Sequence, residues 1–226
     1  MKRAARFLLS AVCLAGALFF ADKPAAGEEG FVPIFNGKNL DGWQGGKDGY
    51  MIEDGAIVSL KEARGSGGNL YTAKEYGDFH LKFEFQLTPG ANNGIGIRQP
   101  LPEAGQRLDP AYAGIEIQVL DDQHERYKGK IKDYQHHGSV YGVVAAKPGH
   151  LKPAGEWNQE EIIVKGKHIT VILNGVTIVD ADVEKASTPK TLDGREHPGL
   201  KRDRGYLCFC GHGEVVKFRN LRIKEL

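Results

Sequence analysis

The sequence predicts an all-β protein, a sandwich of two antiparallel sheets. Period-two alternation of apolar and polar residues dominates the 226-residue chain, and helical stripes are nearly absent. About a dozen short segments of this kind are separated by turn signals, a spacing typical of sandwiches. The chain shows no internal repeat, which a propeller or a solenoid would require, so a sandwich is the fold class that fits best.

Each expected strand has its own signal. Phe79–Leu87 alternates Phe and Leu with polar residues, as does an antiparallel strand with one buried face. Asn174-Gly175 is the strongest short signal for a hairpin turn, and Glu53-Asp54-Gly55 marks a similar turn. The expected strands in chain order are two within Tyr50–Ser59, then Phe79–Leu87, Gly114–Asp122, Glu161–Val164, Ile169–Leu173, Val176–Asp180, Leu207–Cys210 and Val215–Ile223.

The segment Gly114–Asp122 carries polar chemistry on one face. Successive side chains of a strand point to opposite faces, so its Ile and Val residues enter the core. Glu116 and Gln118 then share the other face, which suits polar contact with a ligand. A solvated strand face would show the same pair of residues, so the context has to decide between the two interpretations.

The first 26 residues read as a secretory signal. Three basic residues precede the apolar run Phe7–Phe20, and Pro24-Ala25-Ala26 supplies small residues for cleavage. The run is too short for a good membrane anchor, because a spanning helix needs about 20 apolar residues. We expect a signal peptide at residues 1–26, a single β-sandwich domain at residues 27–226, and a secreted or periplasmic protein without a membrane partner.

Charge and cysteine content limit the classes of ligand that the protein is expected to bind. Cleavage after Ala26 would leave 26 of the 30 basic residues and 28 of the 29 acidic residues, so the mature chain is close to neutral. The sequence also has no basic stripe interleaved with aromatic residues, and both observations argue against a nucleic-acid partner. Cys208 and Cys210 then remain, two apart on one strand, and we expect free, buried thiols lining the core. A metal site is the weaker interpretation, since no second Cys or His pair at zinc spacing accompanies them.

Four long connections are expected to wall a cleft, since loops of this length in compact domains are usually functional or mobile. They are Gln99–Ala113, Asp121–Gly138, Ala145–Gly155 and Val183–Gly205. His136 and His137 are neighbours on extended chain and must point apart, so one solvated and one packed histidine is favoured over a metal pair. His124 lies beside Asp121-Asp122, and a solvated charge cluster and a ligand set fit it equally well.

Six segments form an ordered set of motifs along the chain: Phe35–Trp43, Asn92–Arg98, Gly114–Asp122, Gly138–Gly142, Pro153–Asn158 and Gly211–Asn220. Together they cover about residues 31 to 226. In this order they resemble the secreted 3-keto-disaccharide hydrolase family, long known as a domain of unknown function.

The resemblance implies a concanavalin A-like, lectin/glucanase-type jelly roll whose concave face holds a saccharide. It also implies an activity, the cleavage of glycosides that a separate oxidoreductase has oxidised to a ketone at C3. The chain departs from the family at Cys210-Gly211, where the family has Gln-Asp before the histidine. The departure bears on activity, substrate or metal use and leaves the fold unaffected.

We predict a catalytic group of Arg98, Glu116 and His212. A ketone at C3 acidifies the proton at C2, so one base and one cation at the enolate oxygen can expel the group at C1. His212 or Glu116 can be the base, and Arg98 or a bound divalent ion can stabilise the enolate. The alternative is that Arg98 and Glu116 form a buried structural ion pair, while His212 caps a hairpin.

Other polar and aromatic residues are expected to bind the saccharide. Ordinary retaining hydrolysis is disfavoured, because Glu116 and Asp121 lie about 17 Å apart on a regular strand, far beyond the spacing of a carboxylate pair. The main alternative to an enzyme is a lectin-like saccharide-binding module, and a third interpretation is an interaction domain derived from an enzyme. Trp43 can be a core residue or a sugar-binding residue, and for Trp157 a core position is favoured over sugar binding. The predicted substrate-binding residues are Gln118, Tyr141, Asn93, Asp121 and Trp157.

Overall fold

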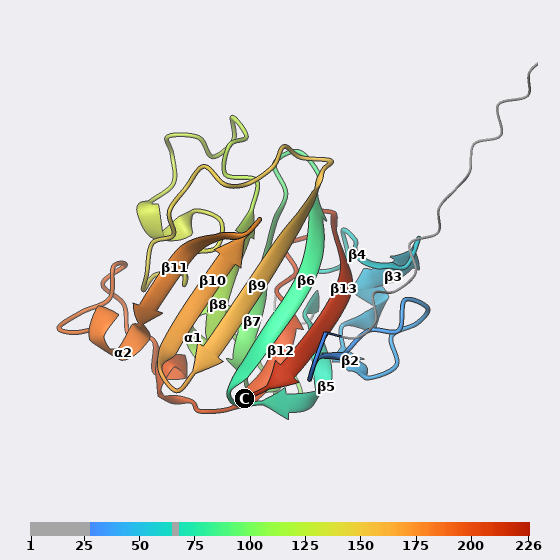
Figure 1. The fold of residues 1–226 in the computed structure, drawn as a ribbon, viewed down its shortest axis with the longest axis horizontal. Helices are drawn as coiled ribbons and strands as arrows, with labels where there is room; N and C mark the ends of the chain where they lie inside the picture. Colours follow the sequence, from blue (N-terminus) through green and yellow to red (C-terminus); the bar gives the residue numbers. More distant parts are fainter. Residues whose placement is uncertain (1–27, 65–67) are drawn as a thin grey trace, which may run out of the picture.

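The computed structural model describes residues 28–64 and 68–226. Two antiparallel sheets stack face to face, and short helices and long loops surround them (Figure 1). The predicted β-sandwich is therefore confirmed. The expected signal peptide at residues 1–26 lies outside the described residues.

Within the described residues, the larger sheet has eight strands in the order β11-β10-β9-β6-β13-β4-β3, with β1 paired to β13. In Figure 1 this sheet lies in front, with β9, β6 and β13 crossing its middle. Its strands are β1 (Val32–Pro33), β3 (Tyr50–Glu53), β4 (Ala56–Ser59), β6 (Phe79–Leu87), β9 (Trp157–Lys165), β10 (His168–Leu173), β11 (Val176–Asp182) and β13 (Val216–Glu225).

The smaller sheet has five strands within the same residues, in the order β2-β5-β12-β7-β8. Its strands are β2 (Trp43–Gly45), β5 (Leu70–Tyr76), β7 (Asn92–Gln99), β8 (Ile115–Leu120) and β12 (Gly205–Phe209). The helical segments are α1 (Pro110–Ala113), α2 (Val183–Ala186) and the 3-10 turns η1 (Lys47–Gly49), η3 (Asp133–Gln135) and η4 (Pro198–Lys201).

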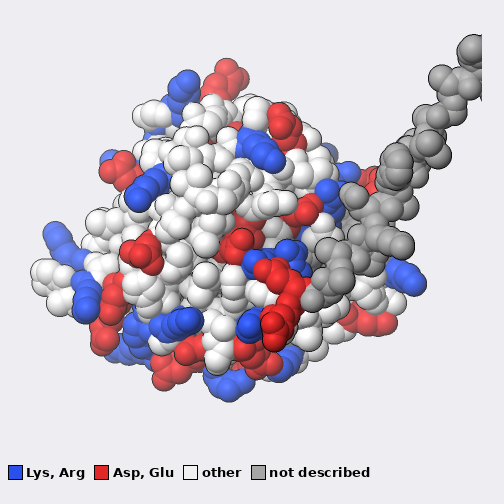
Figure 2. All heavy atoms as spheres, in the orientation of Figure 1, with Lys and Arg blue, Asp and Glu red and all other residues white. Residues whose placement is uncertain are grey.

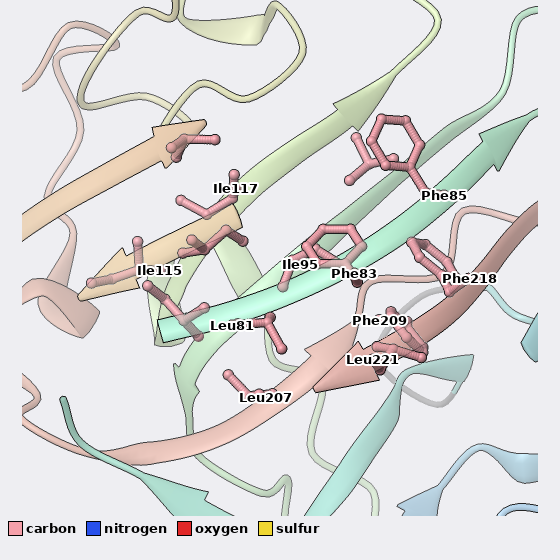
Figure 3. Close-up of a cluster of buried hydrophobic side chains, with 14 of the residues drawn as sticks. Leu81, Phe83, Phe85, Ile95, Ile115, Ile117, Leu207, Phe209, Phe218 and Leu221 are labelled. Carbon is pink, nitrogen blue, oxygen red and sulfur yellow. The ribbon is translucent and has the colours of Figure 1, made fainter. Parts of the chain in front are cut away.

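The core lies between the two sheets (Figure 3). Leu81 and Phe83 project from β6 toward Ile95 and Ile117 of the smaller sheet, and all four are at most 2% exposed. Each side chain of this kind stabilises the fold by about 1.5–3 kcal/mol when buried. Because β6 alternates buried and half-buried residues along its whole length, the predicted half-buried strand is confirmed.

Two tight turns set the register of the hairpins. Asn174 and Gly175 have φ angles of 50° and 83°, and Asp54 and Gly55 have 50° and 74°. Positive φ at both central residues is the geometry whose twist matches a two-residue hairpin. The predicted hairpins β10–β11 and β3–β4 are therefore confirmed.

Acidic and basic side chains alternate over the face of the larger sheet (Figure 2). The Lys82 Nζ atom, for example, lies 2.6 Å from Glu28 Oε1 and 3.3 Å from Glu161 Oε2. In residues 28–64 and 68–226, no helix has the length and apolar character needed to cross a membrane.

Candidate active site

A cavity of about 220 Å³ opens on the outward face of the smaller sheet, away from the core. Strands β7 and β8 supply its floor, and three long loops supply its walls. The lining residues are Asn92, Asp109, Ala111, Tyr112, Glu116, Gln118, Leu120, Tyr127, Ile131, Gln135, Tyr141, Arg195 and His212.

Strand β8 presents Glu116 and Gln118 to this cavity. Ile115, Ile117 and Val119 point into the core, so the period-two pattern holds through the strand. The Gln118 side-chain amide donates to Asn92 Oδ1 at 2.7 Å. This contact orients two amide groups together, an arrangement that can bind sugar hydroxyl groups.

Glu116 is a buried acid, 6% exposed, and its Oε1 atom has no hydrogen-bond partner among the described residues. Burial, with the nearby charge of Asp109, raises the pKa of Glu116 to about 8, and the Cys210 thiol acts in the opposite direction. At pH 7 the carboxyl is therefore mostly protonated and can donate a proton.

His212 lies at the mouth of the cavity, on the connection from β12 to β13, where its backbone pairs with Arg64. The residue is solvent-exposed overall, yet the protein atoms around its ring disfavour the charged form. This desolvation lowers the pKa of His212 below its ordinary value of 6.5, although Glu214 and Asp109 act in the opposite direction. The imidazole is therefore neutral at pH 7 and can accept a proton.

Glu116 and His212 have pKa values shifted in opposite directions within one cavity. Such a pair places a proton donor and a proton acceptor in one cavity near neutral pH. The arrangement can therefore perform acid–base chemistry on a bound group.

Arg195 is the cation of this cavity, and the sequence patterns gave no sign of it. It lies on the loop before η4, and its guanidinium stacks 3.8 Å from the centre of the Tyr112 ring. It also donates to the Tyr112 hydroxyl at 2.6 Å. Burial raises the pKa of Tyr112, so this hydroxyl stays protonated. Only its place in the long Val183–Gly205 connection, predicted to wall a cleft, could have pointed to Arg195.

Asp193 holds the Arg195 loop in place. Its carboxylate accepts hydrogen bonds from the Arg195 backbone N–H at 2.9 Å, the Thr191 hydroxyl at 2.9 Å and the Tyr112 hydroxyl at 3.1 Å. The His197 ring lies 3.1 Å away. Burial opposes ionisation, but the hydrogen bonds outweigh it and lower the pKa of Asp193. The loop is therefore tied to the wall of the cavity through one charged group.

The prediction that long loops wall a cleft holds for three of the four. The first supplies Asp109 and Tyr112, the second Tyr127 and the fourth Arg195, whereas no residue of Ala145–Gly155 lines the cavity. Tyr141 follows the second loop, and its hydroxyl accepts a hydrogen bond from the Gln135 side chain at 3.0 Å. The structure thus brings Glu116, Gln118, Tyr141 and His212, four of the predicted catalytic and substrate-binding residues, into one cavity.

Arg98 does not reach the cavity, and its predicted place beside Glu116 is wrong. It has φ +52° where the β7–β12 register shifts, and this bulge breaks the alternation that would turn its side chain to the face of Glu116. The guanidinium is 1% exposed and donates to Asp78 Oδ1 and the Arg202 carbonyl, both at 3.1 Å. The alternative, an ion pair with Glu116, is wrong as well, because the partner is Asp78.

Asn93 and Asp121 also lie outside the cavity lining. Asn93 pairs with Val119 across the sheet and is fully buried, so its neighbour Asn92 takes the outward position. The Asp121 carboxylate accepts a hydrogen bond from the Gly90 backbone N–H at 2.8 Å and fixes the turn before β7. The alternation therefore identifies the outward residues of β8, whereas Asn93 lies on the core side of β7.

Neither tryptophan lines the cavity. Trp43 is a core residue, stacked on Phe209 with ring centres 5.2 Å apart, and its ring N–H donates to the Ile34 carbonyl at 2.9 Å. Trp157 starts β9 on the larger sheet and is half-buried under Arg219, whose guanidinium lies 3.9 Å from the ring centre. The substrate-binding position predicted for Trp157 is therefore wrong, as is the favoured core position.

The two cysteines and the neighbouring histidines His136 and His137 are buried or exposed as the sequence predicts. Cys208 and Cys210 are free and buried, but they form a cluster with Tyr71 outside the main core instead of lining it. His137 is buried against Glu160 at 2.8 Å, whereas His136 is partly exposed and contacts an aspartate. One packed and one solvated histidine is thus confirmed. Within the described ranges, no group of three or more His, Cys, Asp or Glu residues has a geometry that could hold a metal ion.

A larger hollow of about 430 Å³ lies between α2 and η4 and shares Arg195 with the cavity. Its lining includes Lys190, Glu196 and Lys201, which are exposed side chains of both signs. Its buried histidine is already bound to Asp193. The smaller cavity is therefore the better candidate for chemistry, since it holds both the unpaired buried acid and the neutral imidazole.

Comparison with known proteins agrees with this geometry. Residues 30–224 match the model of the 3-keto-alpha-glucoside-1,2-lyase-like domain. A protein of Bacteroides thetaiotaomicron named 3-keto-disaccharide hydrolase is 30% identical, over 88% of this chain and 79% of that protein. The crystal structure of a putative glycosyl hydrolase from Parabacteroides distasonis is 27% identical, covers 88% of this chain and 94% of that chain, and has a TM-score of 0.75.

More distant structures share the fold alone. The carbohydrate-binding module CBM66 from Bacillus subtilis is 10% identical, with a TM-score of 0.52 over 83% of this chain and 98% of that chain. The extent of the family match settles the membership, since it spans nearly every described residue. The chain therefore belongs to the family of 3-keto-alpha-glucoside-1,2-lyase-like domains.

Proposed function

We propose that this protein cleaves 3-keto-glycosides, including 3-keto-disaccharides, by elimination at C1 and C2 followed by hydration. Its family and the name of its Bacteroides relative support this substrate class. The observation that carries the mechanism is the pair Glu116 and His212, an acid and a base with opposite pKa shifts in one cavity. The volume of about 220 Å³ has room for one sugar ring.

His212 is the general base of this mechanism. Its neutral ring takes the proton from C2, which the neighbouring C3 ketone has made acidic, and an enolate forms across C2 and C3. When the ketone re-forms, the electron pair makes a double bond between C1 and C2, and the bond from C1 to the leaving oxygen breaks. His212 is suited to this step because desolvation keeps it uncharged at neutral pH.

Glu116 is the general acid. Its protonated carboxyl gives its proton to the leaving oxygen, so the leaving group departs as a neutral alcohol. In the second half of the reaction, Glu116 takes a proton from the water that adds to C1, and His212 returns a proton to C2. The sum is the addition of one water to the glycoside, with no net oxidation or reduction.

Arg195 is the group proposed for the enolate oxygen. Its positive charge, fixed in place by Tyr112 and Asp193, favours the developing negative charge. The paired amides of Asn92 and Gln118 and the hydroxyl of Tyr141 are left to bind the sugar hydroxyl groups. This assignment replaces Arg98, whose charge is used in the ion pair with Asp78.

We further propose that the protein works outside the cytoplasm as a mature chain of residues 27–226. The basic start, the short apolar run and the small residues before Gly27 support export. A 3-keto sugar would then meet the protein in the periplasm or outside the cell.

Two matched substrates in heavy water test the proposed reaction. The protein is given a plain glucoside and its 3-keto derivative, and the released leaving group is followed together with deuterium at C2. Elimination predicts cleavage of the keto sugar alone, with deuterium entering C2, because the removed proton exchanges with the solvent.

Other outcomes of this experiment would replace the proposal. Cleavage of the plain glucoside without exchange at C2 would indicate a carboxylate-pair hydrolase. Saturable binding of either sugar without turnover, with divalent ions present and after their removal by a chelator, would indicate a saccharide-binding module.

A further inference from the structure

The Asp193 carboxylate, which fixes the Arg195 loop, has a buried partner in His197. The two side chains are 5% and 1% exposed, and Nε2 of the His197 ring lies 3.1 Å from Asp193 Oδ2 and 3.2 Å from Asp193 Oδ1. The other ring nitrogen, Nδ1, lies 3.0 Å from the Ala111 carbonyl oxygen in α1. The His197 ring therefore joins α1 to the loop that carries Arg195.

Both ring nitrogens of His197 face hydrogen-bond acceptors. A backbone carbonyl has no proton to give, so Nδ1 must be the donor to Ala111. Burial opposes the ionisation of Asp193, but its hydrogen bonds outweigh burial and lower its pKa. Against this carboxylate Nε2 must donate as well, and only an imidazolium carries a proton on both nitrogens. The contacts therefore fit a positively charged His197.

The charge pair of Asp193 and His197 lies in a closely packed place. Gly142 lies against it, and a Cβ atom on Gly142 would be 2.6 Å from Asp193 Oδ2 and 2.8 Å from His197 Nε2. The Tyr112 ring covers another side of the imidazole, with ring centres 4.6 Å apart. A buried charge is costly without a partner of opposite sign, so the two charges balance each other here.

The Arg195 guanidinium takes a different partner. It contacts the ring and the hydroxyl of Tyr112, and among the described residues it forms no ion pair with a carboxylate. Asp193 meets Arg195 at its backbone N–H instead. The negative charge of Asp193 is thus balanced by His197, and the positive charge of Arg195 is left for the cavity.

We propose that His197 is a positioning residue, an imidazolium that balances Asp193 and so keeps the charge of Arg195 available to the enolate oxygen. The role rests on the proposed function, in which Arg195 stabilises the enolate. His197 is absent from the lining of the catalytic cavity and acts only through Asp193 and the Arg195 loop. Without the imidazolium, the Asp193 carboxylate would attract the guanidinium two residues away and weaken its effect on the enolate.

Nitrogen-15 NMR of the parent protein, labelled at its histidine rings, tests the charge of His197 directly. The His197 signals are assigned through their proximity to the Tyr112 ring. At neutral pH we expect one directly bonded proton on each of the two ring nitrogens. A proton on Nδ1 alone would overturn the proposal, and this measurement needs no variant that could fail to fold.

Two variants of the full protein test the effect on Arg195. His197→Gln removes the positive charge but keeps an N–H group that can donate to Asp193. We expect kcat on a 3-keto-glucoside to fall by at least about 10-fold with little change in KM, since Arg195 acts on charge that develops in the transition state. Adding Asp193→Asn to His197→Gln removes the unbalanced negative charge, so the double variant should recover part of the lost kcat.

The matched control is His168→Gln on the larger sheet, where His168 contacts Asp180 at 2.8 Å, far along the fold from the cavity lining. It should leave kcat and KM unchanged. A double variant as slow as His197→Gln, or slower, would overturn the proposal, because packing alone would then explain the loss. A His197→Gln variant with the parent kcat would overturn it too.

The NMR measurement separates this role from the function beneath it. If the parent protein turns over no sugar, the proposed function fails. The protons on the His197 ring then still decide whether it is the charged partner of Asp193. Two ring protons together with rescue by Asp193→Asn support the full role.

Discussion

At the scale of single residues, two arginines differ in what surrounds their guanidinium groups. Arg98 is buried and bound to Asp78 and the Arg202 carbonyl. Arg195 is exposed, stacked on Tyr112 and open to the cavity. The first ties separate segments of the fold together, and the second presents its charge to a ligand.

Alanine at position 98 should therefore lower the stability of the fold, whereas alanine at position 195 should lower the activity. Arg98→Ala should lower the free energy of unfolding by about 2–4 kcal/mol, because the buried guanidinium that joins Asp78 to the Arg202 carbonyl is lost and its site is left empty. Arg195→Ala should lower kcat/KM on a 3-keto-glucoside by about 100-fold with little change in stability. Denaturant unfolding and steady-state kinetics measure both, and a stable but inactive Arg98→Ala would reverse the two assignments.

Glu116 and Gln118 lie on the shared outward face that the sequence predicts, because β8 is a regular strand. Their neighbours Ile115, Ile117 and Val119 all face the core. Arg98 could not be placed in this way, because its positive φ follows from the bulge between β7 and β12. Local periodicity contains no information about where a strand changes register with its partner.

At the scale of elements, β7 combines a regular core face with an outward face that lacks side chains. Ile95 and Ile97 are buried in the core, whereas Gly94 and Gly96 leave space for the neighbouring strands. The sequence places Gly and Ile in alternation here, a pattern that marks a close approach of neighbouring atoms. The identity of the atoms that approach depends on strand order, which the pattern does not contain.

A single methyl group on this face should disturb the site. Gly94→Ala would place Cβ 2.1 Å from Glu116 Oε1, so the carboxyl must move. We expect kcat/KM to fall by at least about 100-fold, since small displacements of a reacting group are costly. Gly77→Ala is the matched control, because its Cβ would meet a backbone oxygen at 3.4 Å. Equal activity in the two variants would contradict the packing of Glu116 over β7.

The loops were predictable in extent but not in their contacts. Length and composition identified four long connections, and three of them wall the cavity. The contacts that fix them, such as Tyr112 with Asp193, join residues 81 positions apart in the chain. Such pairs arise from the tertiary arrangement, so the position of Arg195 could not be predicted from local patterns.

At the scale of the whole molecule, a stiff sandwich supports a site assembled on one outer face. The packed core between the sheets fixes β7 and β8, and these strands hold Glu116 and Gln118 in register (Figure 3). Sites built on strands keep their geometry better than sites on loops alone. Export and the extent of the mature chain remain predictions, because residues 1–27 lie outside the described part.

The central claim is that neutral His212 and protonated Glu116 act together as base and acid. The most direct test is the pH dependence of kcat/KM on a 3-keto-glucoside, for the parent protein and for Glu116→Gln. The rate should rise as His212 loses its proton below pH 6.5 and fall as Glu116 loses its proton near pH 8.

Glu116→Gln should fold, because it removes a buried carboxyl whose ionisation costs stability as the pH rises from about 4.5 toward 8. It should lose most of the activity, and its remaining activity should show no fall near pH 8, because the group that titrates there is absent. A parent rate that climbs through pH 8 and stays high would contradict the account and make ionised Glu116 the base.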